Sequence, residues 1–154
     1  MEYRIEELTC FAEQDYADLC GLLAQLTPGA SLTRDGLDDV LADDNVHLFV
    51  MRDADGRIIA TATLCVCHAL SATKAAIEDV MVDDRHRGCH LGRQLMQHIL
   101  RVAPSFAPEK ICLTSRPQRI AANRLYQSLG FQRRDTNSYQ MAVRRRDEAD
   151  DVKG

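Results

Sequence analysis

The stretch EDVMVDDRHRGCHLGRQLMQHIL, Glu78 to Leu100, decides the fold class of this chain. It begins with alternating apolar residues, which are typical of a strand, and from Leu91 onward its apolar residues have helical spacing. A basic turn that contains Arg87, Gly88 and Gly92 separates the two patterns. The stretch therefore predicts a strand that passes through a glycine turn into a helix.

This predicted junction is suited to holding phosphate. The first turn of a helix leaves backbone N–H groups without partners, and the helix dipole adds partial positive charge there. A glycine lets an anion approach the backbone closely, and Arg85 and Arg87 add two full positive charges. We expect a diphosphate group here. The alternative is a tight turn whose glycines serve only its conformation.

The remaining sequence continues the alternation of strands and helices. The predicted strands are 3–9, the hairpin pair 46–53 and 57–69 around Asp55-Gly56, 75–82, 110–115 and 131–143. The predicted helices are 14–26, 31–44 with Ser31 as its cap, 91–102, and 119–129 closed by Gly130. We expect one α/β (α+β) domain over residues 1–146, followed by a disordered acidic tail over 147–154.

Composition is that of an ordinary globular domain. Of 154 residues, 45% are hydrophobic and 27% are charged, and no apolar run approaches the roughly 18 residues that a membrane span needs. The first residues lack a basic stretch followed by an apolar one, so they do not resemble a secretory signal. The six cysteines are scattered without a CxxC pair. These features predict a soluble cytoplasmic protein with reduced thiols.

Charge is distributed unevenly along the chain. Residues 1–84 contain 5 basic and 17 acidic residues, a balance of −12, whereas residues 85–146 contain 13 basic and 2 acidic residues, a balance of +11. The last eight residues carry −3. The asymmetry suggests an anion bound by the second part and a cation or amine that approaches the first.

Two separate stretches resemble the GNAT superfamily of N-acetyltransferases. RHRGCHLGRQLM is similar to its acyl-CoA signature, with Arg87, Gly88, Cys89, His90, Leu91 and Gly92 at the signature positions. AANRLYQSLGFQRR is similar to the later helix and turn of the family, and it contains Tyr126. The resemblance implies a single-domain GNAT fold with a mixed, mostly antiparallel central sheet and helices on both faces, reaching to about Arg144.

The resemblance also implies the reaction. An acetyl group moves from acetyl-CoA, the acyl-donor substrate, to a primary amine by direct attack in a ternary complex. In the family the pantetheine arm of the cofactor lies along the strand that here carries Val80, Met81 and Val82. A backbone N–H around Met81 or Val82 is then placed to stabilise the oxyanion. Asn123 is a further candidate contact of the cofactor arm.

Three side chains are candidates for proton transfer. Tyr126 matches the general acid of the family, which protonates the departing thiolate. A protonated amine must lose its proton before it attacks, which requires a carboxylate or a water held by one. Glu78 and Asp79 are the candidates for this base, and because they alternate along a strand we expect only one of them to face the cleft.

The chain departs from the family pattern at two positions. His90 stands where the signature has its first glycine. It can point outward without effect, donate a hydrogen bond to phosphate, or weaken cofactor binding, and we favour the first of these. Arg119 stands where the family often carries an Asn.

No metal is expected. In CVCH, residues 65–68, the two cysteines face one way in a strand and the histidine faces the other. His86 and His90 have the spacing of a zinc-protease motif, but Arg87 stands where that motif needs its Glu.

The acceptor is open between several classes. Residues 77–96 are similar to glucosamine 6-phosphate N-acetyltransferases, whereas the acidic first part favours a cationic amine without phosphate, such as an amino-acid side chain, a polyamine or an aminoglycoside. A non-catalytic CoA-binding regulatory module is the alternative from another class. We expect a small-molecule or peptide amine as partner, no nucleic acid and no membrane, with a homodimer as one option for assembly.

Overall fold

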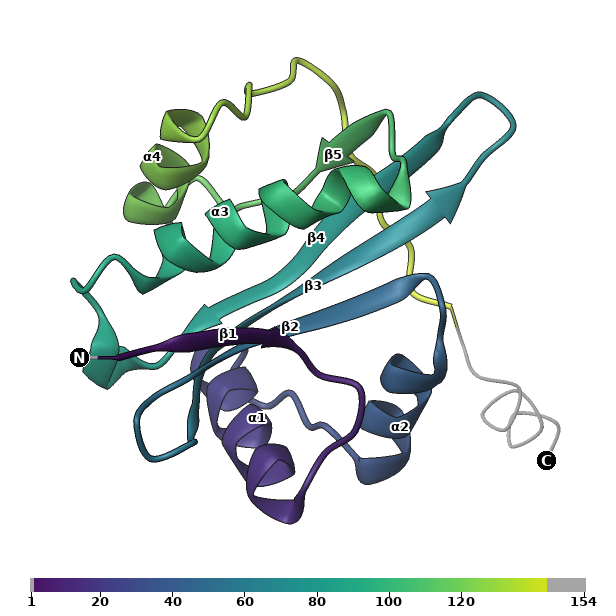
Figure 1. Ribbon diagram of the computed structural model, residues 1–154. Helices are drawn as coiled ribbons and strands as arrows, with labels where there is room; N and C mark the ends of the chain where they lie inside the picture. The colour runs from purple at the N-terminus through teal and green to yellow at the C-terminus, as the bar shows by residue number, and fades with distance from the viewer. Residues whose placement is uncertain (1, 144–154) are drawn as a thin grey trace, which may run out of the picture.

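The computed structural model describes residues 2–143, so Met1 and the predicted acidic tail over 147–154 lie outside the described residues. The strands are β1 (Arg4–Glu7), β2 (Val46–Arg52), β3 (Ile58–His68), β4 (Thr73–Val82) and β5 (Lys110–Cys112). The helices are α1 (Glu13–Leu26), α2 (Arg34–Ala42), α3 (Leu91–Val102) and α4 (Ile120–Ser128), with short 3-10 turns η1 (Asp84–His86) and η2 (Ala103–Phe106). Figure 1 shows their arrangement.

The five strands form one sheet in the order β1-β2-β3-β4-β5. The first four strands pair antiparallel with their neighbours, and β5 pairs with β4 in parallel, with Ala75 opposite Ile111. The parallel pair arises because the chain crosses from β4 to β5 through α3. Helices α1 and α2 cover one face of the sheet, and α3 and α4 cover the other (Figure 1). This is the mixed, mostly antiparallel sheet that the sequence predicted.

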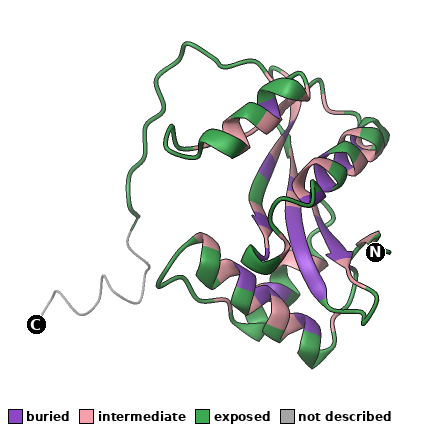
Figure 2. Cartoon of the chain, turned by 90° about the vertical axis from the view of Figure 1, so that its left-hand side faces the viewer, coloured by how far each residue is buried: buried purple, intermediate pink, exposed green. Residues whose placement is uncertain are grey.

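A hydrophobic core lies on each face of the sheet, and β2 contributes side chains to both cores. Phe49 and Met51 belong to the core under α3, whereas Leu48 and Val50 belong to the core under α1 and α2. Figure 2 shows the buried residues along the strands and on the inner sides of the helices. The four residues that α3 buries are at most 1% exposed: Leu91, Leu95, Met96 and Ile99. Burial of each such side chain contributes about 1.5–3 kcal/mol, which explains why this amphipathic pattern folds as a helix.

A β-bulge interrupts β4 where the predicted base lies. Thr63 pairs with Glu78 and Thr61 pairs with Met81, so Asp79 and Val80 stand opposite a single residue of β3. Asp79 lies in the bulge, and its backbone has a left-handed conformation with φ 52°. As a result Val80 and Val82 pack on the α3 side while Met81 enters the core on the other face. The simple alternation that the sequence predicted for Glu78 and Asp79 is broken here.

Two sequence predictions about elements are wrong. Helix α2 begins after Thr33 rather than Ser31, because the Thr33 hydroxyl accepts the Gly36 N–H at 2.9 Å. The predicted strand over 131–143 does not form: residues 132–143 are exposed and have no regular structure. Among the described residues the segment has no pairing with any strand of the sheet, although β5 ends the strand order.

The described residues contain no helix that is both long and apolar enough to cross a membrane. All six cysteines are free thiols.

Candidate functional site

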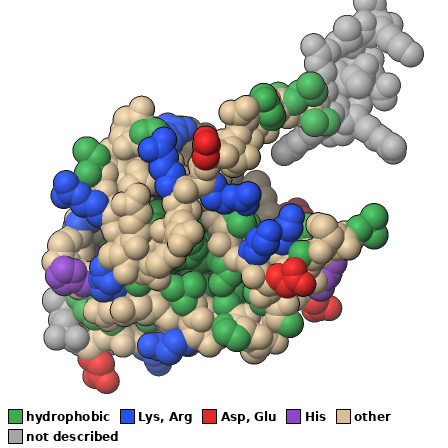
Figure 3. Space-filling model, turned by 90° about the horizontal axis from the view of Figure 1, so that it is seen from above, with side chains coloured by type: hydrophobic (Ala, Val, Ile, Leu, Met, Phe, Trp, Pro, Cys, Tyr) green, Lys and Arg blue, Asp and Glu red, His purple; other side chains and the backbone are tan. Residues whose placement is uncertain are grey.

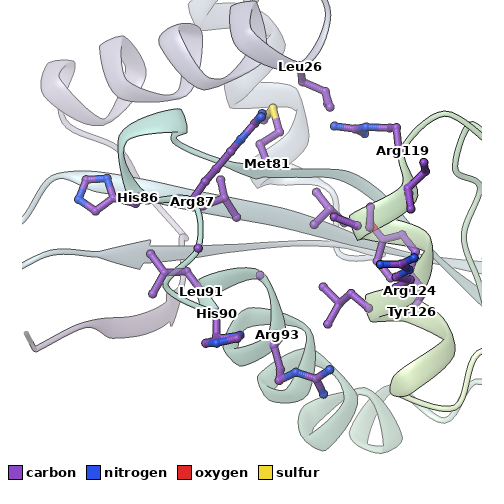
Figure 4. A pocket seen from close by; sticks show the side chains of 18 of the residues that line it. Leu26, Met81, His86, Arg87, His90, Leu91, Arg93, Arg119, Arg124 and Tyr126 are labelled. Atoms are coloured by element: carbon purple, nitrogen blue, oxygen red, sulfur yellow. The ribbon is translucent and has the colours of Figure 1, made fainter.

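A cavity of about 990 Å³ opens where the strand-to-helix junction meets α4. Its walls are the end of β4, the turn before α3 and the first residues of that helix, one side of α4 and the last turn of α1. Figure 4 shows how side chains from these separate elements surround it. Lys and Arg side chains gather on the molecular face that carries α3 and α4, as Figure 3 shows. The junction singled out from the sequence is thus one wall of a cavity.

The turn before α3 holds its shape with two left-handed residues. Gly88 has φ 80°, and His90, the residue before the helix, has φ 59° and ψ 24°. A glycine adopts this conformation freely, whereas a side chain makes it strained. The family signature has glycine at the second of these positions, so the departure at His90 has a conformational cost. The His90 side chain does not cap the helix, is exposed, and lies at the cavity wall.

The start of α3 offers backbone donors to the cavity. The first hydrogen bond of its ladder runs from the Gln94 N–H to the His90 carbonyl at 3.1 Å. The amides of Leu91, Gly92 and Arg93 precede that bond and therefore have no partner within the helix. A Cβ on Gly92 would lie 3.5 Å from the Leu125 side chain, in ordinary van der Waals contact, so α3 and α4 pack closely at this point.

Four arginines line the cavity: Arg87, Arg93, Arg119 and Arg124. Figure 4 shows Arg119 and Arg124 on the α4 side, opposite Arg87 on the turn. Arg93 donates to the Ser128 hydroxyl at 2.6 Å and so ties α3 to α4. Of these four arginines, sequence reasoning assigned only Arg87 to the phosphate site. The basic balance of residues 85–146 was the available signal for the other three, but their convergence depends on how α4 packs over α3.

Arg85 was expected to add charge to the phosphate site, but its side chain lies outside the cavity. Its guanidinium pairs with Asp83 at 2.9 Å, and it does not line the cavity. Burial acts to raise the pKa of Asp83, but hydrogen bonds from Arg85 and Gln25 outweigh it and hold that pKa below its usual value. Arg87 pairs with Asp84 at 2.7 Å with both side chains largely exposed, so this weak pair leaves it free to exchange partners.

Gln25, in the last turn of α1, is a site residue that sequence reasoning missed. Its side chain accepts the Asp84 N–H at 3.0 Å and donates to Asp83 at 3.4 Å. Gln25 also lines the cavity. It therefore fastens α1 to the turn that carries the basic residues, which nothing in its local sequence indicated.

The end of β4 presents an open edge to the cavity. Strand β5 pairs with β4 only as far as Ala76 opposite Cys112, whereas β3 pairs with β4 up to Val82. Val80, Met81 and Val82 all line the cavity. The Asp83 N–H donates to the Ile59 carbonyl at 2.8 Å on the β3 side. Because backbone groups alternate sides along a strand, the N–H and C=O of Val82 point to the open edge.

Tyr126 lies deep in the same cavity. It is 8% exposed, and its ring packs edge-on against Phe131 with centroids 6.2 Å apart. Burial raises the pKa of Tyr126, and the nearby positive charge of Arg119 opposes that rise only in part. The hydroxyl therefore stays protonated at neutral pH, as a proton donor must.

Four predicted site residues lie outside the cavity lining. Glu78 and Asp79 are exposed at the bulge, just before the strand residues that line the cavity. Their charges add to burial in raising the pKa of Cys65. Asn123 donates to the carbonyls of Arg116 and Arg119 at 2.9 Å each, and thus fixes the entry into α4. Cys89 is exposed on the turn.

The structure gathers no metal ligands in the part that it describes. Among these residues there is no group of three or more His, Cys, Asp and Glu side chains that could hold a metal ion.

Comparison with protein families identifies the class that this fold and cavity define. The family model described as "Acetyltransferase (GNAT) family" matches residues 11–131. The chain belongs to the GNAT acetyltransferase family, as the two sequence stretches indicated.

Solved structures share the fold of this chain. An acetyltransferase of Trypanosoma brucei is 24% identical, with a TM-score of 0.72 over 93% of this chain and 99% of the other. Glucosamine-6-phosphate N-acetyltransferase from Arabidopsis thaliana is 22% identical, with a TM-score of 0.70 over 94% and 99%. AAC(6')-Iy, in complex with the bisubstrate analogue CoA-S-monomethyl-acetylneamine, is 19% identical, with a TM-score of 0.72 over 93% and 100%. No curated protein matches the chain.

Proposed function

We propose that this protein transfers the acetyl group of acetyl-CoA to a primary amine by direct attack in a ternary complex. The observation that carries the proposal is one cavity lined by an open strand edge, the N-terminus of α3, four arginines from the turn, α3 and α4, and the buried Tyr126. Family membership supports acyl transfer in general, and AAC(6')-Iy binds a CoA-containing analogue. The donor and the amine are our inference.

Three features of the cavity suit three parts of the proposed donor. The amides of Leu91, Gly92 and Arg93, together with Arg87, suit a diphosphate, because helix N-termini and guanidinium groups both bind anions. Farther in, the open edge of β4 suits an extended chain with amide groups, which can pair with backbone as a strand does. The Val82 amide, which faces this open edge, is then available to stabilise the oxyanion of the thioester carbonyl. Gly88, Cys89 and His90 shape the turn between these two parts.

The reaction balances with the groups present. The amine nitrogen forms a bond to the acetyl carbon, and the carbon–sulfur bond breaks. The excess proton on the amine goes to Glu78 or Asp79 through water, since neither carboxylate lines the cavity. The Tyr126 hydroxyl gives its proton to the departing thiolate and recovers one from solvent.

Two acceptor classes have separate support. Glucosamine 6-phosphate is favoured by the similarity of residues 77–96 and by the arginines, some of which can hold a sugar phosphate. A cationic amine is favoured by the balance of −12 over residues 1–84. We favour the cationic amine. The diphosphate of the proposed donor already explains the positive charge of the turn before α3, so this charge is not evidence for a second phosphate on the acceptor.

The experiment combines calorimetric titration of acetyl-CoA with turnover on a panel of amines, with acetylated products identified by mass spectrometry. Binding of acetyl-CoA followed by transfer to at least one amine is the expected result. Binding without transfer to any amine would assign the protein to the regulatory, non-catalytic class. Absence of binding would remove the acetyl-CoA proposal altogether.

A further inference from the structure

The cavity holds more arginines than one diphosphate needs. In the proposed function, Arg87 and the first amides of α3 suit the diphosphate, which leaves Arg93, Arg119 and Arg124 without an assigned ligand. None of these three guanidinium groups forms an ion pair within the described part of the chain. Because positive charges that line one cleft attract anions, the cavity favours a ligand with a second anionic group.

Two of these arginines border the same part of the cavity, one from each helix. Arg93 of α3 donates to the Ser128 hydroxyl of α4 at 2.6 Å. Arg124 precedes Ser128 by four residues, which places both side chains on one face of α4, and both line the cavity. Figure 4 shows the Arg93 side chain extending from α3 toward α4, whereas Arg119 extends toward Leu26 and is not part of this pair.

The pair keeps free hydrogen-bond donors. The Ser128 hydroxyl donates to the Leu125 carbonyl at 2.7 Å and accepts from Arg93, so it holds the Arg93 guanidinium in one direction. A guanidinium has five N–H groups, and most of those on Arg93 have no partner among the described residues. The Arg124 guanidinium forms no hydrogen bond or ion pair among them. Two such groups on neighbouring helices suit a phosphate, whose oxygens accept several bonds from guanidinium donors.

The proposed donor carries a matching group. Besides its diphosphate, acetyl-CoA has a 3′-phosphate on the same ribose. This group is close to a dianion at neutral pH, because the second pKa of a phosphate monoester is about 6. Arg93 belongs to the first turn of α3, beside the amides that suit the diphosphate. The two anion sites of the protein are therefore neighbours, as the two phosphate groups of the donor are.

We propose that Arg93 and Arg124 form a phosphate-monoester subsite that holds the 3′-phosphate of the donor, with Ser128 as the residue that orients Arg93. The subsite makes the protein distinguish a CoA ester from its 3′-dephospho form. This inference rests on the proposed use of acetyl-CoA, but it does not depend on transfer to an amine. A sugar-phosphate acceptor contains the same chemical group, and the experiment separates the two sources.

The test is calorimetric titration of acetyl-CoA and acetyl-3′-dephospho-CoA at one ionic strength. The unchanged protein should bind acetyl-CoA at least about 10-fold more tightly than the dephospho form, as expected for charge-assisted bonds to one phosphate. Arg124→Ala should reduce this ratio to about 3-fold or less, by the same reasoning. Arg101→Ala is the matched control, because it removes one exposed positive charge from α3 outside the cavity lining, and it should keep the full ratio.

Ser128→Ala tests the orientation of Arg93 without a change of charge. Loss of this one hydrogen bond should lower the ratio by about 2-fold to 10-fold. An unchanged ratio would overturn the role of Ser128. Circular dichroism checks that all three variants keep their helices.

Equal affinity of the unchanged protein for the two donors overturns the subsite, and a full ratio in Arg124→Ala overturns its assignment to this pair. Failure of both donors to bind contradicts the proposed function instead. The acceptor arm measures the KM of glucosamine and of glucosamine 6-phosphate at saturating acetyl-CoA. If Arg124→Ala raises only the KM of the phosphorylated sugar and keeps the donor ratio, the pair serves the acceptor and the proposal is wrong.

Discussion

At the scale of single residues, His90 shows how a departure from a signature is tolerated. The position demands a left-handed backbone, with φ 59°, and glycine is the residue that meets this demand without strain. Histidine is among the residues that enter this region more often than most. The turn therefore keeps its shape with a side chain present, at the expense of some stability.

Replacement of His90 by glycine should therefore stabilise the protein. We expect His90→Gly to raise the free energy of unfolding by about 0.5–1 kcal/mol, since relief of the left-handed strain outweighs the added chain entropy. Urea unfolding measures the change. His68→Gly is the matched control, because His68 lies in extended backbone at the end of β3 and its replacement should destabilise. Equal losses for both variants would contradict the strain argument.

Tyr126 is the second residue whose setting defines its chemistry. Burial raises the pKa of its hydroxyl, so the protonated form, which donates, persists at neutral and mildly alkaline pH. Deprotonation removes the donor only as the pH rises through this raised pKa. The alkaline fall in kcat should therefore begin above pH 10, the ordinary tyrosine value.

We expect Tyr126→Phe to lower kcat by about 100-fold or more while acetyl-CoA affinity barely changes, because only the hydroxyl is lost. The residual activity should also lack the alkaline fall. Steady-state kinetics from pH 7 to 11, paired with calorimetric titration, measure both effects. Full activity in this variant would mean that the thiolate leaves without a proton from Tyr126.

At the scale of elements, the turn between β4 and α3 places two arginines differently, although the sequence analysis expected both to bind phosphate. Arg87 lines the cavity, and Arg85 is held outside it by Asp83. If a diphosphate binds in the cavity as proposed, Arg87 is the one of the two that lies beside it.

Arg87→Ala should weaken acetyl-CoA binding by about 1.5–3 kcal/mol, as expected for a lost charge-assisted hydrogen bond. Arg85→Ala removes the same charge from the same turn and should change affinity far less. Calorimetric titration of both variants at one ionic strength makes the comparison. If the two lose affinity equally, general charge rather than a specific contact holds the phosphates.

The elements also show what the sequence could predict. Helix 91–102 matched its predicted bounds, because four apolar residues at helical spacing and Pro104 beyond them are local signals. The bulge at Asp79 could not be predicted, since it depends on how β3 and β4 align. Arg119 and Arg124 line the cavity because of how α4 packs, and the sequence does not show that packing. The strand predicted over 131–143 is absent from the sheet, because pairing with a neighbouring strand depends on the fold and not on the local pattern.

At the scale of the whole molecule, charge divides along the chain. Residues 85–146 supply most of the cavity lining and carry +11, while residues 1–84 carry −12. Such a division draws oppositely charged ligands to different parts of one surface.

If the acidic part steers the acceptor, the preferred amine carries a positive charge beyond the reacting group. Its kcat/KM should fall as salt shortens the Debye length toward about 8 Å at physiological ionic strength. The measurement uses neutral, cationic and phosphorylated amines across a salt series at saturating acetyl-CoA, so that salt effects on the donor do not contribute. Glucosamine 6-phosphate as the best substrate at every salt concentration would refute the steering hypothesis.

If the acyl donor pairs with the open edge of β4 as proposed, its supply also affects the stability of the folded chain. A ligand that completes the sheet binds the folded chain and not the unfolded one. At a free concentration one hundred times its Kd, such a ligand adds about 2.7 kcal/mol to the stability of the folded state. That is a large fraction of the 5–15 kcal/mol by which a domain is ordinarily stable. The lifetime of this protein in a cell should therefore follow the supply of its acyl donor, with starved cells degrading it faster than fed ones.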